Sequence, residues 1–147
     1  MTNDPPIATV TPVCEDDATG VVADVFADIK ATKNLDFVPN FWRTIAVYPT
    51  LLQQVWSQLK AVMHPEADDR EGHLTPVVRE MIAVAVSATN GCAYCLNSHT
   101  RALQSMGVSD GSIGEVLAVA GLFNQTNTLA DGFQVEPDIK PLAFKGS

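Results

Sequence analysis

The feature that most constrains the fold is the spacing of apolar residues, which recur every three or four positions and show no strand-like alternation. This spacing predicts a helix from about residue 19 to residue 32 and a short helix after Asn40, which is a candidate N-cap. A third helix is predicted to begin at Pro49, because proline suits the first turn of a helix. A polar loop at residues 64–73 follows it.

Three further segments carry helix start or stop signals. A Thr-Pro pair at residues 75–76 opens an apolar helix, and an Asn-Gly pair at residues 90–91 ends it, because both residues tolerate the left-handed backbone of a helix C-terminus. The next helix spans about residues 92–107. The last helix is capped at Ser109-Asp110 and continues to about residue 131. The sequence therefore predicts an all-α fold of five or six helices.

The chain of 147 residues, 46% of them hydrophobic, suits one domain with a packed core. Residues 1–18 contain three prolines and an acidic run, and residues 132–147 contain two prolines. We therefore expect an extended N-terminal arm at 1–18, a helical domain at 19–131 and an extended tail at 132–147.

Charge and composition argue against several classes of partner. The net charge is −8 and the basic residues are scattered, so neither nucleic acid nor an anionic membrane is an expected partner. No basic segment followed by an apolar one opens the chain, and no apolar run reaches 18 residues. With three cysteines and no such leader, we expect a cytoplasmic protein whose close cysteine pair is redox-active or metal-binding.

The chemistry-bearing residues gather at the start of the fifth predicted helix. Cys92, Cys95 and His99 share one helical face, and the helix N-terminus favours the thiolate form of a cysteine. If the chain turns back near residue 90, the two flanking helices run antiparallel and Glu80 faces residues near position 100. His99 is then its natural partner, and a carboxylate oriented on this imidazole forms a proton relay to the thiols.

The segment from Glu80 to His99 resembles the AhpD-like alkylhydroperoxidases of the carboxymuconolactone decarboxylase family. Their redox members carry a glutamate, a Cys-x-x-Cys pair and a histidine four residues later, and the flanks at 38–42 and 107–110 also resemble family sequences. The resemblance extends from about residue 35 to residue 130. It implies an AhpD-like helical bundle and disfavours decarboxylase activity, because the decarboxylases of the family lack the cysteine pair.

By position, the resemblance implies that Cys95 attacks a hydroperoxide, Cys92 resolves the sulfenic acid as a disulfide, and Glu80 with His99 moves the proton. No bound metal or flavin is implied. Electrons are expected from an external dithiol, such as a lipoyl-bearing or thioredoxin-like protein. Tyr94 departs from the best-studied members, which have a second histidine there; a tyrosine donates a hydrogen bond but does not shuttle protons near neutral pH.

The same residues have plainer interpretations. Cys92, Cys95, His99 and Glu80 offer four zinc ligands, and buried cysteines can also simply pack, so a non-catalytic oligomeric module is the alternative function. Glu80 is also a candidate for an ion pair with a neighbouring arginine, Arg79 or Arg101. No role is predicted for Cys14, and both His64 and His73 are expected to be exposed. The remaining candidates are aromatic residues that line either a substrate channel or, more often at this spacing, a core or interface: Phe37, Phe41, Trp42, Tyr48 and Trp56.

A homo-oligomer is the last expectation. Residues 77–88 and 113–123 are apolar on more than one helical face, which five or six helices cannot enclose in a monomer. The family resemblance implies a trimer or a hexamer.

Overall fold

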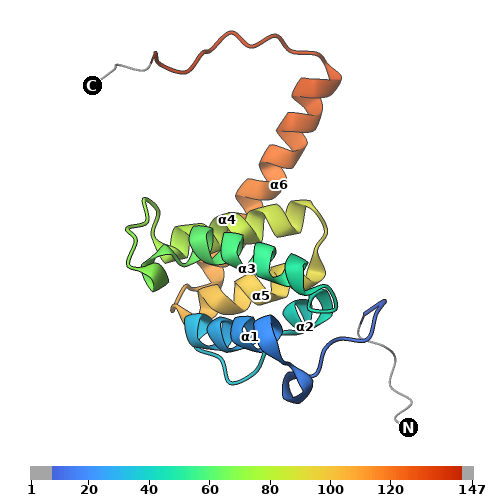
Figure 1. Ribbon diagram of the computed structural model, residues 1–147. Coiled ribbons are helices and arrows are strands. Elements are labelled where there is room, and N and C mark those ends of the chain that lie inside the picture. The colour runs from blue at the N-terminus through green and yellow to red at the C-terminus, as the bar shows by residue number, and fades with distance from the viewer. Residues whose placement is uncertain (1–7, 144–147) are drawn as a thin grey trace. The chain divides into compact units, whose positions relative to one another are not determined.

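The computed structural model describes residues 8–143 and is all-helical over that range (Figure 1). No strand occurs among these residues, so the predicted all-α fold is confirmed. The chain divides into two compact units, Met1–Pro76 and Val77–Ser147. Residues 1–7 of the predicted arm and 144–147 of the predicted tail lie outside the described residues.

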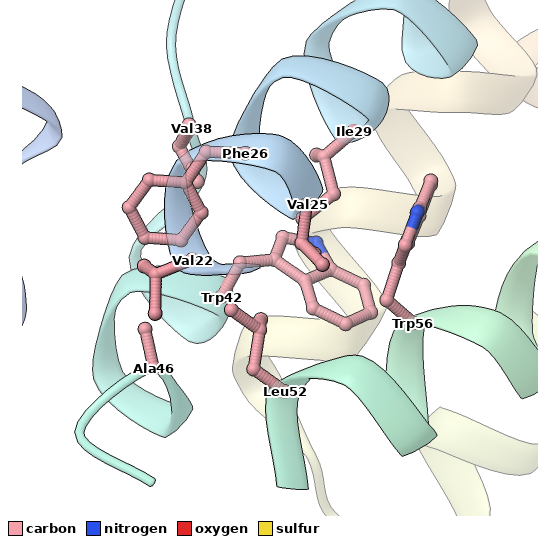
Figure 2. Close-up of a cluster of buried hydrophobic side chains, with 9 residues drawn as sticks. All are labelled: Val22, Val25, Phe26, Ile29, Val38, Trp42, Ala46, Leu52 and Trp56. Carbon is pink, nitrogen blue, oxygen red and sulfur yellow. The ribbon is translucent and has the colours of Figure 1, made fainter. Parts of the chain in front are cut away.

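The first unit is built from α1 (Gly20–Lys33), α2 (Asn40–Ile45) and α3 (Pro49–Met63). Proline opens α3 as predicted, but Asn40 does not cap α2: Pro39 holds the N-cap position and Asn40 is the first helical residue. The Trp42 indole lies between side chains of α1 and α3 and meets the Trp56 ring edge-on, with centroids 5.1 Å apart (Figure 2). Nine buried side chains form this core: Val22, Val25, Phe26, Ile29, Val38, Trp42, Ala46, Leu52 and Trp56.

The part of the N-terminal arm nearest α1 is held in place rather than fully extended. It forms a short 3-10 helix, η1 (Glu15–Asp17), which the sequence analysis missed. The Glu15 carboxylate accepts the Val38 amide at 2.6 Å and the Lys30 ammonium at 3.1 Å. The hydrogen bond from Val38 is the main cause that lowers the pKa of Glu15. One side chain therefore ties three segments of this unit together.

The predicted loop after α3 also contains a 3-10 helix, η2 (Pro65–Asp68). Lys60 explains its position, because its ammonium lies 3.0 Å from Asp28 on α1 and 3.1 Å from Asp68 on η2. Asp28 also accepts the indole N–H of buried Trp56 at 2.7 Å. A polar cluster thus covers one edge of the tryptophan core.

The second unit consists of α4 (Pro76–Thr89), α5 (Ala93–Ser105) and α6 (Asp110–Gly132). The predicted stop at residues 90–91 is confirmed, and Gly91 adopts a φ of +71°, which favours glycine. Ser109 caps α6 through a hydrogen bond from the Ser112 amide. The buried apolar core of this unit is small: Val84, Leu103 and Ile113.

Helix α4, which is apolar on more than one face, is buried over only part of its surface. Its buried positions are Arg79, Glu80, Val84 and Ser87, three of them polar. Val78, Ile82 and Val86 form an exposed stripe on the same helix. A run of apolar residues alone does not show which face the rest of the chain covers.

Helix α6 has a single buried residue, Ile113, near its start. Its second half extends beyond α4 and α5 of the same unit, and every residue from 121 to 143 is exposed (Figure 1). Within the described part of the chain, no helix is both long and apolar enough to span a membrane.

Candidate active site

The turn between α4 and α5 places the first cysteine at a helix N-terminus. Gly91 turns the chain, and the Cys92 amide donates to the Ser87 carbonyl at 3.0 Å. Cys92 is the N-cap of α5, and its sulfur accepts the backbone N–H of Cys95 at 3.3 Å. This sulfur therefore occupies the place where a capping oxygen normally accepts one of the unpaired amides of the first turn.

The two thiols are free, partly buried and different in acidity. The pKa of Cys92 is lowered, first by a hydrogen bond from the Cys95 thiol and then by the Cys95 amide. The pKa of Cys95 is raised, because its thiol donates to Cys92 and because burial disfavours its charged form. Hydrogen bonding to the Cys92 sulfur and burial of the Cys95 thiol therefore act on the two pKa values in opposite directions.

Glu80 reaches across from α4 to His99 on α5. Its Oε2 lies 2.7 Å from His99 Nδ1, and the Glu80 residue is only 4% exposed. A carboxylate accepts, so Nδ1 carries a proton and donates it. The predicted meeting of these two residues is confirmed, and it fixes the orientation of the imidazole ring while its second nitrogen remains available for proton exchange.

The four residues form two pairs, one at the start of α5 and one that joins α5 to α4. Cys92 with Cys95 occupies the first turn of α5, and His99, one turn later, is held by Glu80. Over residues 8–143, no hydrogen bond joins His99 to either sulfur. Tyr94, between the cysteines, is 44% exposed. Among the described residues, no group of three or more His, Cys, Asp or Glu side chains is arranged to hold a metal ion.

The other predicted candidates lie elsewhere. Cys14 is exposed at the N-cap of η1, and His73 is exposed as predicted, whereas His64 is half-buried and that prediction was wrong. Trp42 and Trp56 belong to the core of the first unit. The remaining aromatic candidates are exposed: Phe37, Phe41 and Tyr48.

The sequence analysis missed two features of this unit. One is the hydrogen bond that the Cys95 amide donates to the Cys92 sulfur. The signal available in the sequence was a cysteine directly after the helix stop at residues 90–91. The other is an apolar groove of about 340 Å³ where α4 and α6 meet. Seven residues line it: Ala85, Val86, Thr89, Asn90, Ala120, Phe123 and Asn124.

Residues 53–135 match the carboxymuconolactone decarboxylase family, which is more than half of the chain. The chain belongs to this family. Its AhpD-like character is supported by the solved core of an alkylhydroperoxidase AhpD from Rhodospirillum rubrum, which is 42% identical with a TM-score of 0.82. That match covers 90% of this chain and 95% of the other.

Two curated relatives are shorter matches. A (R)-2-haloacid dehalogenase from Pseudomonas putida is 31% identical over 80% of this chain, and the chain spans 38% of its length. An alkyl hydroperoxide reductase AhpD from Streptomyces avermitilis is 38% identical over 35% of this chain, which spans 29% of that protein. The chain therefore spans less than half the length of either relative, and the two relatives bear the names of different activities.

Proposed function

We propose that this family member is a thiol-dependent peroxidase and disulfide oxidoreductase whose redox centre is the Cys92–Cys95 pair. The observation that carries the proposal is the placement of two free, unequal thiols at the start of α5, with His99 one turn later on that helix and held by the buried Glu80 carboxylate of α4. The AhpD core that this chain resembles over nearly its full length supports the peroxidase class.

The reaction transfers two electrons from the thiols to the peroxide. One thiolate attacks the terminal oxygen of a hydroperoxide, the O–O bond breaks and an alcohol leaves, which gives a sulfenic acid. The second sulfur then attacks the first, water leaves and the Cys92–Cys95 disulfide forms. An external dithiol reduces the disulfide and restores both thiols. No cofactor bound to the protein is required.

The Glu80–His99 pair serves as the proton relay of this cycle. Each turnover moves protons from the thiols to the departing alkoxide and hydroxide, and an imidazole titrates near neutral pH. The buried Glu80 carboxylate accepts the Nδ1 proton of His99 and holds the ring in place for this transfer. Tyr94 contributes a hydrogen-bonding hydroxyl at the same turn. Free thiols throughout the described chain suit a cytoplasmic location.

A donor screen tests the proposal. Consumption of hydrogen peroxide is measured with dihydrolipoamide, thioredoxin and glutathione supplied in turn. We expect turnover with at least one dithiol donor and little with glutathione, because a dithiol releases the mixed disulfide intramolecularly. Stoichiometric zinc in the purified protein, together with no peroxide consumption under any donor, would instead support the non-catalytic module.

We also propose that the protein is a homo-oligomer, a trimer or a hexamer by family resemblance. Residues 116–130 of α6 carry no charged side chain although most of them are exposed. An uncharged helix face of this length is not the surface of a monomer. The Val78, Ile82 and Val86 stripe on α4 is a second uncovered apolar surface in the same unit.

Two exposed phenylalanines make a matched test of this assembly. Phe123 on α6 is 57% exposed and Phe37 in the first unit is 54% exposed. Light scattering after size exclusion should show that Phe123→Glu lowers the mass of the assembly, because a buried unpaired charge disfavours an interface. Phe37→Glu should leave the mass unchanged. A wild-type protein at the monomer mass of 15.7 kDa would refute the oligomer.

A further inference from the structure

Helix α6 carries an apolar stripe that its own unit leaves uncovered. Four large side chains at helical spacing form this stripe, and each is about half exposed: Val119, Leu122, Phe123 and Leu129. We propose that the α6 stripe packs antiparallel against the α6 stripe of a second copy, around a two-fold axis beside Phe123. This inference rests on the proposed homo-oligomer, and it specifies which surfaces meet and in which register.

The charges of α6 give the limits and the centre of this contact. The helix contains no lysine or arginine, and Glu115 and Asp131 bound its uncharged segment, residues 116–130. Phe123 lies at the middle of this segment and also lines the groove between α4 and α6. An antiparallel pair centred there places the two uncharged segments against each other and leaves the acids at the ends.

The acids at the ends do not oppose this register strongly. Glu115 and Asp131 are each eight residues from Phe123. Helices that cross at about 50°, a common packing angle, diverge by roughly 10 Å at eight residues from the crossing point. Exposed charges at that separation are largely screened at physiological ionic strength.

The groove and the stripe together form a surface that is complementary to itself. A two-fold axis requires such a surface, because it brings the same patch of both copies together. The groove has a volume of about 340 Å³, and its apolar walls include Ala85 and Val86 of α4 and Ala120 of α6. The exposed Phe123 ring is the largest side chain of the stripe. In the pair, the ring of each copy packs at the groove of the other.

The polar side chains of the groove are largely compatible with burial. Asn124 Nδ2 on α6 donates to Thr89 Oγ1 on α4 at 3.0 Å, so two of the three polar residues that line the groove bond to each other. A polar group that already has a partner costs less to bury than one without. Covering the groove with a second copy therefore leaves this pair satisfied.

The uncovered surface is also large enough for a stable contact. Val86 lines the groove and continues on α4 into the exposed side chains of Ile82 and Val78. A stable interface takes about 20–30 residues from each partner. The uncharged segment of α6, with the stripe and groove residues contributed from α4, provides a surface at the lower end of this range. Residues 121–132 are exposed throughout, and helices in proteins gain most of their stability from packing.

Other occupants fit the groove less well. The Val135 amide donates to the Ala130 carbonyl at 3.0 Å, and Gln134 has a φ of +52°, which together fix the direction in which the chain leaves α6. The tail from there to residue 143 is exposed, and none of its residues lines the groove (Figure 1). An uncharged stripe also offers no group that would attract a partner of opposite charge. A second copy requires neither a redirected tail nor a charged contact.

Cysteine cross-linking tests the register. The parent carries serine at positions 14, 92 and 95, and its mass is compared with that of the wild-type protein by light scattering. Single cysteines then replace each residue of the stripe in turn, and the similar exposure of the four side chains makes them matched controls. Disulfides between chains are followed during mild oxidation.

The two central positions should cross-link and the two flanking positions should not. Phe123→Cys and Leu122→Cys should form disulfides between chains at least about tenfold faster than Val119→Cys and Leu129→Cys. Near the axis, the Cα atoms of the two copies lie within the roughly 7 Å that a disulfide allows. The flanking positions lie about 15 Å from their own copies along the helix. Leu122→Cys leaves Phe123 in place, so it tests the register even if loss of the ring weakens the contact.

The outcomes separate the pairing from the assembly beneath it. If the parent is oligomeric but the central cysteines react no faster than the flanking ones, the pairing is wrong and the oligomer stands. Equally fast cross-linking at all four positions would indicate a parallel pair and overturn the register. A monomeric wild-type protein would overturn both proposals.

The mass of the wild-type assembly gives a second test that needs no variant. A two-fold pair requires an even number of chains, so we expect a hexamer rather than a trimer. A wild-type trimer would overturn the pairing of α6 and leave the homo-oligomer standing.

Discussion

The first unit encloses nine apolar side chains, Trp42 among them, and several of its charged residues form ion pairs at the surface. The second unit encloses only three apolar side chains, and it buries Arg79, Glu80 and Ser87 beside them. It also leaves apolar side chains of α4 and α6 exposed. In the first unit apolar side chains are buried, as is usual. In much of the second unit polar side chains are buried and apolar side chains are exposed.

This difference indicates that the two units have different roles. Buried polar groups stabilise a fold weakly at best, since they give up hydration, but they hold reactive groups in fixed orientations. The second unit carries the thiols and the Glu80–His99 pair, and its exposed apolar faces suit contact with other copies of the chain. Over residues 8–76, the first unit brings no cysteine and histidine together in this way, and its largest feature is the tryptophan core.

Two leucines provide the strongest test of this contrast, because both are fully buried. Leu52→Ala should lower the free energy of unfolding by about 3–5 kcal/mol, since the large core around it cannot collapse fully into the cavity. Leu103→Ala should cost about 2–3 kcal/mol, because the smaller core around it can relax more. Urea denaturation at one fixed protein concentration measures both. Equal losses would show that the second core is as tightly packed as the first.

Changing Glu80 separates catalysis from packing. Glu80→Gln keeps the volume and a hydrogen-bond acceptor for His99 but replaces the carboxylate of the proposed proton relay with a neutral amide. Peroxide turnover should fall roughly a hundredfold while the thermal midpoint changes little. Glu115→Gln, at an exposed acid on α6, is the control and should leave turnover unchanged. If Glu80→Gln turns over at the wild-type rate, Glu80 has no part in the mechanism.

Acid sensitivity should be greater in the first unit. Burial opposes ionisation of Asp28, but hydrogen bonds from Trp56 and Lys60 outweigh it and lower its pKa in the folded state. A lowered folded pKa contributes stability above the ordinary value of 3.8, and this contribution is lost as the pH falls through the lowered pKa. Asp28→Asn should therefore remove about 1 kcal/mol near neutral pH and less at pH 3, because the carboxylate is partly exposed. An equal loss at both pH values would contradict this assignment.

The smallest expected effect concerns the helix that extends from the second unit. Ser109 accepts the Ser112 amide at 3.1 Å as the N-cap of α6. Ser109→Ala should lower the free energy of unfolding by about 1 kcal/mol, and Ser109→Asp should restore it because a carboxylate also caps. Failure of the aspartate to restore stability would indicate that the loss has another origin.

Most helix boundaries were predictable because they depend on local signals. Pro49, Gly91 and Ser109 act through their own backbone or side chain, and the structure has helix ends at each. The pairing of Glu80 with His99 was predictable from an antiparallel turn near residue 90. The function proposed for that pair remains a prediction.

The features that sequence did not reveal depend on distant segments. The 3-10 helix at Glu15 exists because its carboxylate accepts the Val38 amide, 23 positions away. The exposed stripe on α4 depends on which side chains the other helices cover. The unequal acidity of Cys92 and Cys95 depends on the contact between the two thiols, on the Cys95 amide and on burial, none of which can be read from the residue types.

The central claim is that the Cys92–Cys95 pair is a two-electron redox centre. Its most direct test is to treat the reduced protein with one equivalent of hydrogen peroxide, count the remaining thiols and map disulfides by peptide mass. The account predicts the loss of two thiols per chain, a disulfide between Cys92 and Cys95, and retention of the Cys14 thiol. Three unchanged thiols after treatment, or a disulfide that includes Cys14 instead, would contradict it.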